Sequence, residues 1–195
     1  MRKSEIERNT TETQIKINLN LDGSGKNKIN TSIAFFDHML VLFSKHSMID
    51  LDIKARGDTH IDDHHTVEDI GICLGDAIKE ALGDKKGIFR YGNFSLPMDE
   101  TLVDVALDIS GRPFLIYNVG IEERYIKEFD ISLIEEFMRA LVNRLGLTLH
   151  VNLRYGSGAH HIIEAVFKGL AKALRQAVAV DSRSSDIPSS KGRID

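Results

Sequence analysis

The same residue pattern occurs twice in this chain, as His64-His65-Thr66-Val67-Glu68 and as His160-His161-Ile162-Ile163-Glu164. Each copy follows a related segment, because Phe36-Asp37-His38-Met39-Leu40 aligns with Ile134-Glu135-Glu136-Phe137-Met138. The alignment then runs on without a gap until a loop from which two residues must be dropped. Self-similarity of this kind, with chemistry-bearing residues at equivalent positions, predicts an internal duplication.

Hydrophobic periodicity around the two copies predicts the same order of elements in each half. Apolar and polar side chains alternate in the expected strands, while the expected helices have apolar residues at helical spacing. Strands are expected near residues 13–21, 28–32, 49–55, 88–96, 102–109, 114–119 and 147–153. Helices are expected near residues 35–46, 62–82, 131–145 and 160–180, the second of them capped by Asp62 and Asp63.

These elements predict an α+β fold with two pseudo-symmetric halves, each a small β-sheet packed on two helices. We expect residues 1–85 to form the first half. Residues 86–195 are expected to form the second half, with a polar C-terminal tail that binds substrate, and the halves together make one functional domain.

Composition restricts the classes of protein to which the chain can belong. Its 195 residues are 42% hydrophobic and 28% charged, as in ordinary globular proteins, and suffice for a substantial core. The net charge of -4 argues against nucleic-acid binding. The single cysteine, Cys73, cannot form an intrachain disulfide. Because we find neither an apolar signal-peptide core after Met1 nor a run long enough to span a membrane, we expect a cytoplasmic protein without membrane partners.

Helix geometry indicates how the repeated pattern could bind metal ions. Residues four apart share a helical face, whereas neighbours diverge by about 100°. Each copy should therefore serve two ions, one through its first His and Glu and the other through its middle His. With the aligned His38 and Glu136 added, the predicted ligand sets are His38, His65, His160 and Glu164 for one ion, and His64, Glu68, Glu136 and His161 for the other.

The chemistry of these ligands suits manganese, iron or zinc in an open or octahedral site, since imidazole and carboxylate are mixed without thiolate. A lone helical histidine is more often a surface or packing residue, but two His pairs with Glu at the same spacing indicate ligation. Glu135 remains an alternative to its neighbour Glu136 in the second set.

Candidate phosphate ligands occur in three further segments. Arg90 and Arg112 each lie beside glycines near the end of an expected strand, and the tail contributes Ser189, Ser190 and Lys191. Cationic side chains, hydroxyls and free backbone amides are suited to bind a phosphate group. Taken singly, each segment is a weak signal, because an arginine at a strand end is more often solvated.

The ordered motifs resemble those of the imidazoleglycerol-phosphate dehydratase family over nearly the whole chain. They are Arg8-Asn9-Thr10-Thr11-Glu12-Thr13, Phe36-Asp37-His38-Met39-Leu40, Asp62-Asp63-His64-His65-Thr66-Val67-Glu68-Asp69, Asp108-Ile109-Ser110-Gly111-Arg112-Pro113, His160-His161-Ile162-Ile163-Glu164-Ala165 and Pro188-Ser189-Ser190-Lys191-Gly192. The resemblance implies a duplicated α+β fold, two Mn²⁺ per active site and a 24-subunit cage built from trimers. The resemblance also implies that the active sites of this cage lie between neighbouring subunits.

The same resemblance implies a reaction and the residues that perform it. The substrate would be D-erythro-imidazole glycerol phosphate, dehydrated to imidazole acetol phosphate in histidine biosynthesis while its imidazolate bridges the two ions. The implied catalytic carboxylates are Glu12 and Glu164. The implied substrate contacts are Glu12, His38, His46, His64, His65, Glu68, Arg90, Arg112, Ser189, Ser190 and Lys191. Two rival interpretations of the ligand pattern are a dinuclear metallohydrolase and a protein that only stores or is held together by metal ions.

Overall fold

The structure, a computed structural model, describes residues 1–194 and has the same element order in both halves, apart from an additional β8–β9 hairpin (residues 125–130) in the second. The elements of the first half are β1 (Lys3–Asn9), β2 (Thr13–Asn20), β3 (Asn27–Asn30), α1 (Ala34–Ser47), β4 (Asp50–Gly57) and α2 (His64–Leu82). Those of the second half are β5 (Tyr91–Met98), β6 (Thr101–Asp108), β7 (Phe114–Asn118), β8 (Tyr125–Ile126), β9 (Phe129–Asp130), α3 (Leu133–Leu145), β10 (Thr148–Tyr155) and α4 (Ala159–Val178).

The two large sheets have matching topology and matching register. Their strand orders are β1-β2-β4-β3 and β5-β6-β10-β7, and in each sheet only the last pair is parallel. Ile17 pairs with Ile6 and Ile53 in the first sheet. The equivalent residue of the second sheet, Val105, pairs with Phe94 and Val151. The expected α+β fold with two pseudo-symmetric halves is therefore confirmed.

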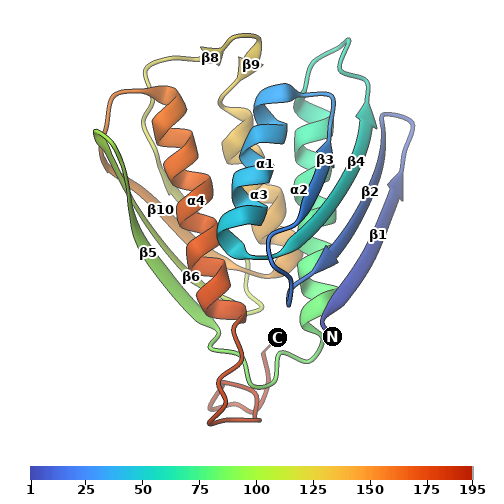
Figure 1. Cartoon of the computed structure of the whole chain (residues 1–195), viewed down its shortest axis with the longest axis vertical. Helices are drawn as coiled ribbons and strands as arrows, with labels where there is room; N and C mark the ends of the chain where they lie inside the picture. Colours follow the sequence, from blue (N-terminus) through green and yellow to red (C-terminus); the bar gives the residue numbers. More distant parts are fainter. Residues whose placement is uncertain (195) are drawn as a thin grey trace.

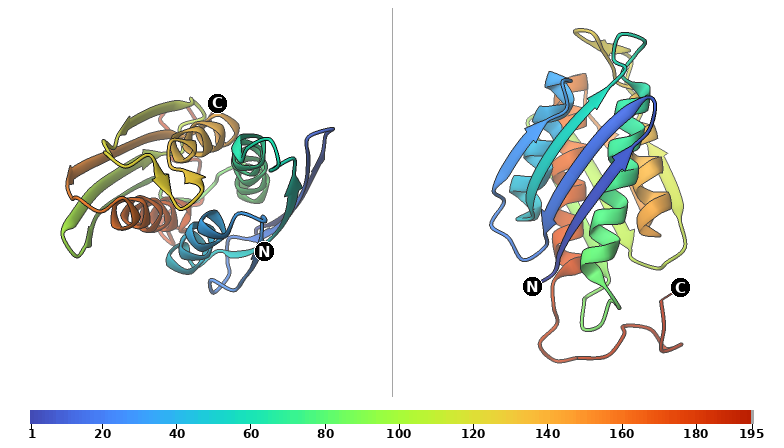
Figure 2. Two further views of the ribbon diagram at one scale, coloured as in Figure 1. Left: turned by 90° about the horizontal axis from the view of Figure 1, so that it is seen from above. Right: turned by 90° about the vertical axis from the view of Figure 1, so that its right-hand side faces the viewer.

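All four helices lie between the two sheets, which form the outer layers (Figures 1 and 2). Helix α1 packs against α4 and helix α2 against α3, so contacts between the halves fill the centre of the molecule. Phe36 from α1, Phe137 from α3 and Phe167 from α4 are fully buried there. The Phe36 ring meets the other two edge-on, at centroid distances of 5.2 and 6.4 Å. This apolar centre fixes the helices whose N-terminal turns contain the repeated His residues.

A glycine allows α2 and α3 to approach each other closely. A Cβ atom at Gly71 would lie 2.8 Å from the carbonyl oxygen of Phe137 and 2.9 Å from the Cβ of Ala140. Any larger residue at this position would push the two helices apart. Within residues 1–194, no helix is long and apolar enough to cross a membrane.

Three features of the fold differ from the expectations. The edge strand β1 was missed because its alternate residues are charged, as in Lys3, Glu5 and Glu7, which is typical of a protected sheet edge. The short β8–β9 hairpin was also missed. The side chain of Asp63 makes no capping hydrogen bond at the start of α2, and the carboxylate of Asp62 instead accepts one from the backbone N–H of His64 at 2.8 Å.

Candidate metal and phosphate sites

Both His-His-x-x-Glu segments lie in the first turn of a helix that packs against one of the sheets. The His64 and His65 rings are 6.2 Å apart with an angle of 71° between their planes. The His160 and His161 rings are 6.3 Å apart at 89°. Neighbouring rings thus point in different directions, as expected from helix geometry.

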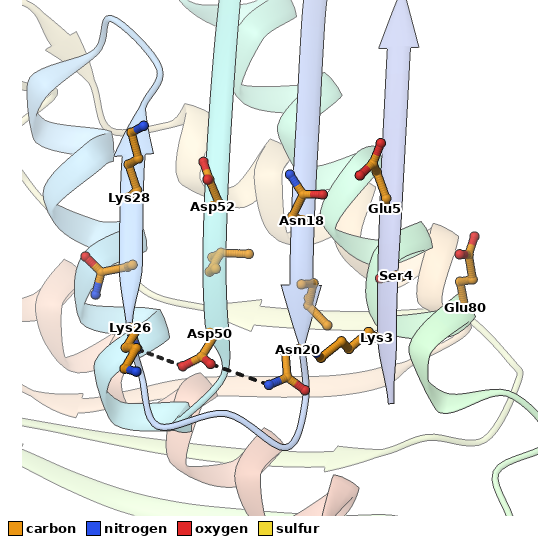
Figure 3. Close-up of a pocket in the computed structure, with 13 residues that line it drawn as sticks. Lys3, Ser4, Glu5, Asn18, Asn20, Lys26, Lys28, Asp50, Asp52 and Glu80 are labelled. Atoms are coloured by element: carbon orange, nitrogen blue, oxygen red, sulfur yellow. Dashed lines mark hydrogen bonds between the residues drawn. The ribbon is translucent and has the colours of Figure 1, made fainter. Parts of the chain in front are cut away.

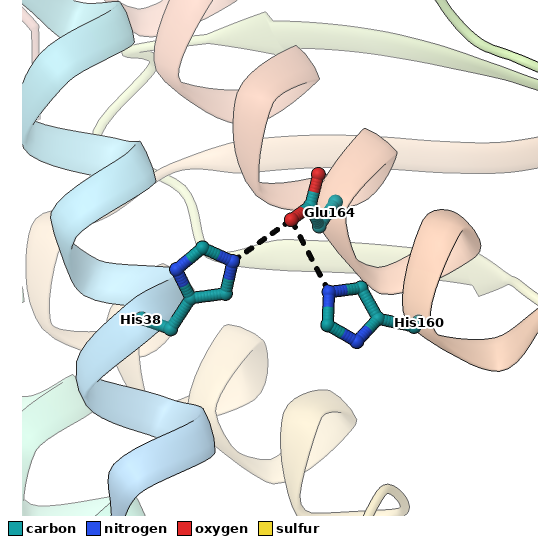
Figure 4. Close-up of side chains that lie close together, drawn as sticks. All are labelled: His38, His160 and Glu164. Carbon is teal, nitrogen blue, oxygen red and sulfur yellow. Dashed lines mark hydrogen bonds and ion pairs between the residues drawn. The ribbon is translucent and has the colours of Figure 1, made fainter.

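One cluster of ligand-type side chains forms between α1 and α4 (Figure 4). His38 Nε2 lies 2.8 Å and His160 Nε2 lies 3.3 Å from the same Glu164 oxygen, Oε1. The second oxygen of Glu164 accepts a hydrogen bond from Lys168 Nζ at 2.5 Å. Three of the four residues predicted for one ion therefore lie together within a single chain.

The donor atoms of this cluster fit a divalent ion. His38, His160 and Glu164 each offer one ligand atom, and these atoms all lie within 4.8 Å of one another. An ion about 2.0–2.3 Å from each donor is compatible with this spacing. Burial acts to raise the pKa of Glu164, but hydrogen bonds from Lys168 and His38 overcome it and hold that pKa at about 2. The carboxylate is consequently ionised and ready to ligate.

His65, the fourth predicted member of that set, contacts other residues in this chain. Its Nδ1 lies 3.1 Å from a carboxylate oxygen of Asp58, which the sequence analysis did not single out. Its Nε2 lies 4.0 Å from Glu12, the residue implied as catalytic. The hydrogen bond with Asp58 raises the pKa of His65. Glu12 and His65 are thus neighbours, and His65 Nε2 is not bound to the cluster around His38.

The second predicted set is only partly assembled within one chain. His64 Nε2 and Glu68 Oε2 are 3.5 Å apart. Glu136 instead forms an ion pair with Arg139 at 3.8 Å, and Glu135 forms one with the same arginine at 2.6 Å. Which of the two glutamates is the metal ligand therefore stays open. In the described part of the chain, no third ligand-type residue closes a group around His64 and Glu68.

His161, the remaining member of that set, faces the β5–β6 hairpin. Its Nδ1 lies 2.9 Å from Glu100 Oε2 and 3.9 Å from Asp99. These residues make up the other compact group of ligand-type side chains within residues 1–194. The hydrogen bond with His161 lowers the pKa of Glu100 to about 2. Glu100, like Asp58, is absent from the predicted site because it lies in a loop without helical periodicity.

A cavity of about 790 Å³ opens beside the cluster of His38, His160 and Glu164. Phe35 and Phe129 form an aromatic wall, and the Phe35 ring meets the His160 ring edge-on at 5.5 Å. The remaining lining comes from the start of α1, from Thr59 and Asp63 in the loop between β4 and α2, and from the β8–β9 hairpin that contains Lys127. This cavity could admit a small ring next to the metal ligands.

The predicted phosphate ligands converge on a different cavity, of about 370 Å³, beside the C-terminal tail. It is lined by Arg90, Tyr91, Ser110, Arg112, Ser189, Ser190, Lys191, Arg193 and Ile194. Arg90 is occupied there, since Asp108 accepts from Nε and Nη2 at 2.7 and 3.0 Å and the Pro188 carbonyl accepts from Nη1 at 2.8 Å. It anchors the tail. Among residues 1–194 no carboxylate pairs with Arg112 or Lys191, so both can offer their charge to a phosphate.

His46 belongs to α1 and Lys168 to α4, the two helices that pack against each other beside the metal cluster. Burial, followed by the nearby charges of Lys172 and Lys168, lowers the pKa of His46, an implied substrate contact that lines neither cavity. Lys168 was missed by the sequence analysis. Its position one turn after Glu164 on the same helical face was the available signal.

A further groove, of about 720 Å³, lies on the outer face of the first sheet (Figure 3). Its lining contains lysines, carboxylates and asparagines of the sheet, and Asp50 accepts hydrogen bonds from the backbone N–H of Lys26 and from the side chain of Asn20. Its lining contains no histidine and none of the candidate site residues. We therefore assign the groove no part in the site.

Comparison with known proteins gives one consistent family. A family model described as imidazoleglycerol-phosphate dehydratase matches residues 31–174. The imidazoleglycerol-phosphate dehydratase of Geobacter metallireducens is 57% identical over 193 residues, with 99% of both chains covered. The one from Syntrophus aciditrophicus is 53% identical, with 98% of both chains covered.

Solved structures of such enzymes have the same fold. The crystal structure of the Staphylococcus aureus dehydratase has a TM-score of 0.82 at 43% identity, covering 90% of this chain and 98% of that one. The Pyrococcus furiosus enzyme, in complex with (S)-C348, has a TM-score of 0.84 at 38% identity, covering 96% and 99%.

Proposed function

The chain belongs to the imidazoleglycerol-phosphate dehydratase family, and from that premise we propose how its residues perform a metal-dependent dehydration. It is a hydro-lyase of histidine biosynthesis. The proposed reaction converts D-erythro-imidazole glycerol phosphate to imidazole acetol phosphate. The observation that carries the metal dependence is the convergence of His38, His160 and Glu164 from two helices of one chain. We propose the cytoplasm as the compartment, in keeping with a biosynthetic role.

We propose that two Mn²⁺ ions are held by the eight predicted ligands, with iron and zinc as alternatives. His38, His160 and Glu164 contribute to one ion together with His65, and His64 and Glu68 contribute to the other with His161 and Glu136. Bound by these ligands, the ions would supply Lewis acidity that favours the imidazolate form of the substrate ring. The chain's own part is to fix these donors, since the pKa of about 2 keeps Glu164 ionised at neutral pH.

Proton transfer is assigned to Glu12. The reaction removes a hydroxyl group and a proton from adjacent carbons, and a carboxylate near the ring can move that proton. The Glu12 side chain is about half exposed, and its Oε1 lies 4.0 Å from His65 Nε2. Glu164 is less suited to this role, because a group with a pKa of about 2 takes up a proton poorly near neutral pH. We propose ligation as its function.

Substrate recognition is assigned to both cavities. Arg112 and Lys191, with Ser189 and Ser190, would bind the phosphate, while Arg90 holds the tail in place through Asp108 and Pro188. Phe35 and Phe129 would flank the imidazole beside His160. The polar and cationic lining of the smaller cavity suits a phosphate better than an apolar group.

The two cavities lie too far apart in one chain for a single substrate molecule. Helix α4 has 20 residues and spans about 30 Å, with His160 in its first turn. Its last turn is next to the phosphate cavity, because the Arg90 backbone N–H donates to the Ala177 carbonyl. The β8–β9 hairpin and the C-terminal tail accordingly lie at opposite ends of the molecule (Figure 1). The substrate is only roughly 10 Å long by its covalent dimensions.

We therefore propose that active sites form between subunits, with the metal ligands of one chain facing the phosphate cavity of another. Closed symmetric assemblies are the common solution for such shared sites. A 24-subunit cage built from trimers, as the family resemblance implies, is the assembly we propose. Mass measurement of the metal-loaded protein by light scattering tests it, and an active monomer would contradict it.

Product analysis separates this function from its rivals. Metal-loaded protein incubated with imidazole glycerol phosphate is expected to form imidazole acetol phosphate and no inorganic phosphate. A dinuclear hydrolase would release inorganic phosphate, and a storage protein would leave the substrate unchanged. Full turnover in protein rigorously stripped of metal would contradict the metal dependence.

A further inference from the structure

Two glutamates occupy equivalent positions in the duplicated fold. Glu12 immediately precedes Thr13, the first residue of β2, and Glu100 immediately precedes Thr101, the first residue of β6. The matching registers of the two sheets make β2 and β6 equivalent strands. Each glutamate therefore lies at the tip of the first hairpin of its half.

Both glutamates face the middle histidine of their own half, at different distances. Glu12 is 4.0 Å from Nε2 of His65, whereas Glu100 is 2.9 Å from Nδ1 of His161. In the first half, Nδ1 of His65 is contacted instead by Asp58 at 3.1 Å. The same ring atom is thus bound by a different carboxylate in each half.

The sequence after the equivalent strands β4 and β10 explains this difference. Asp58 follows Gly57 at the end of β4, and the equivalent position after Tyr155 of β10 is Gly156, which has no side chain. A Cβ atom at Gly156 would lie only 2.4 Å from Thr101 Oγ1, so any side chain at this position would require Thr101 to move. In the second half, the carboxylate in contact with the histidine comes from the hairpin.

Glu100 is itself held on two sides. Its Oε1 accepts hydrogen bonds from Thr101 Oγ1 at 3.1 Å and from the backbone N–H of Gly158, just before α4, at 3.3 Å. Its Oε2 faces His161. Because a carboxylate only accepts, Nδ1 of His161 carries the hydrogen, and Nε2 of the neutral ring has the lone pair.

We propose that Glu100 is a positioning residue that fixes His161 with Nε2 directed to a divalent ion. Asp58 does the same for His65, which leaves Glu12 free to move protons. Equivalent carboxylate positions in the two halves thereby have different roles, proton transfer at Glu12 and positioning at Glu100. Carboxylates hydrogen-bonded to ligand histidines commonly fix their orientation in this way. The inference rests on the proposed metal-dependent function.

The test measures Mn²⁺ binding without substrate, by electron paramagnetic resonance of the free ion. Glu100→Ala is expected to lower the affinity for one of the two Mn²⁺ ions about 10–100-fold and to leave the affinity for the other unchanged. Glu100→Gln retains an oxygen that accepts from Nδ1, so it should recover most of that affinity. Asp99→Asn is the matched control and should bind Mn²⁺ as the wild type does, because Asp99 lies 3.9 Å from Nδ1 and is largely exposed.

Variants in the first half provide the reciprocal test. Asp58→Ala should lower the affinity for one Mn²⁺ ion to a similar extent. Glu12→Gln should keep the affinity for both ions and lose turnover. Wild-type Mn²⁺ affinity in folded Glu100→Ala would overturn the inference, as would equal losses in the Ala and Gln variants. Absence of Mn²⁺ binding in the wild type would instead contradict the proposed function.

Discussion

Replacing Lys168 by methionine removes the shortest ion pair of the metal cluster while keeping the length of the side chain. Lys168 Nζ is 2.5 Å from Glu164 Oε2, and the two side chains are only 15% and 10% exposed. Burial alone would raise the pKa of Glu164 above its ordinary value of 4.5, and the hydrogen bonds hold it at about 2. Without the lysine, only the hydrogen bonds from His38 and His160 remain to counter the rise that burial causes in the pKa of Glu164.

The size of the effect follows from that pKa. One unit corresponds to about 1.4 kcal/mol, so a folded pKa of about 2 in place of 4.5 represents roughly 3–4 kcal/mol. This stabilisation is fully present above pH 4.5 and is lost as the pH falls through about 2. Breaking a fully buried ion pair costs about 3–5 kcal/mol. Since His38 and His160 still donate to Glu164, we expect Lys168→Met to lower the free energy of unfolding by about 2–3 kcal/mol at pH 7.

Urea unfolding of the metal-free protein at one fixed protein concentration measures this difference. The gap between wild type and Lys168→Met should shrink as the pH is lowered from 7 toward 2, because Glu164 becomes protonated in both proteins. Lys172→Met, one turn further along α4, is the control and should change the free energy of unfolding by less than about 0.5 kcal/mol. Equal losses in the two variants, or a gap that does not depend on pH, would refute the reasoning.

Three other perturbations test separate parts of the structure. His160→Ala should lower the Mn²⁺ content and abolish turnover, whereas Arg112→Ala should raise KM with both ions retained. Loss of metal from the Arg112 variant would show that Arg112 is wrongly assigned as a phosphate ligand. Mn²⁺ affinity should fall as the pH drops through the raised pKa of His65, because a ligand imidazole must be neutral. Calorimetry should find the midpoint of this loss of affinity at a lower pH in Asp58→Asn than in the wild type, and an unshifted midpoint would argue against the role of Asp58. Gly92→Ala should destabilise the fold by about 2–4 kcal/mol in urea, because its Cβ would clash with the Ala173 backbone carbonyl, whereas Gly120→Ala meets no neighbour and should be nearly neutral.

Periodic elements and contacts along helix faces could be predicted from the sequence. His38, His160 and Glu164 lie together because helix spacing and the internal repeat place them on facing turns. The core strands were found for the same reason, since apolar alternation such as that of Ile15, Ile17 and Leu19 follows directly from burial of one sheet face.

Contacts that depend on loops could not be predicted in this way. Asp58 and Glu100 reach the histidines from a strand end and a hairpin tip, where no period relates sequence to direction. The charged alternate residues of β1 conceal a strand that is defined by its pairing with β2. The separation of the two cavities by the length of α4 is likewise a property of the folded chain.

The proposal that each active site is shared between chains has a direct test in mixed assemblies. His160→Ala and Arg112→Ala subunits, each nearly inactive alone at low substrate, are unfolded together, refolded with Mn²⁺ and assayed for imidazole acetol phosphate. A shared site combines an intact metal cluster from one variant with an intact phosphate cavity from the other, so random mixing should restore about a quarter of wild-type activity. Activity no higher than that of the separate variants, in assemblies shown to contain both subunits, would contradict a site built between chains.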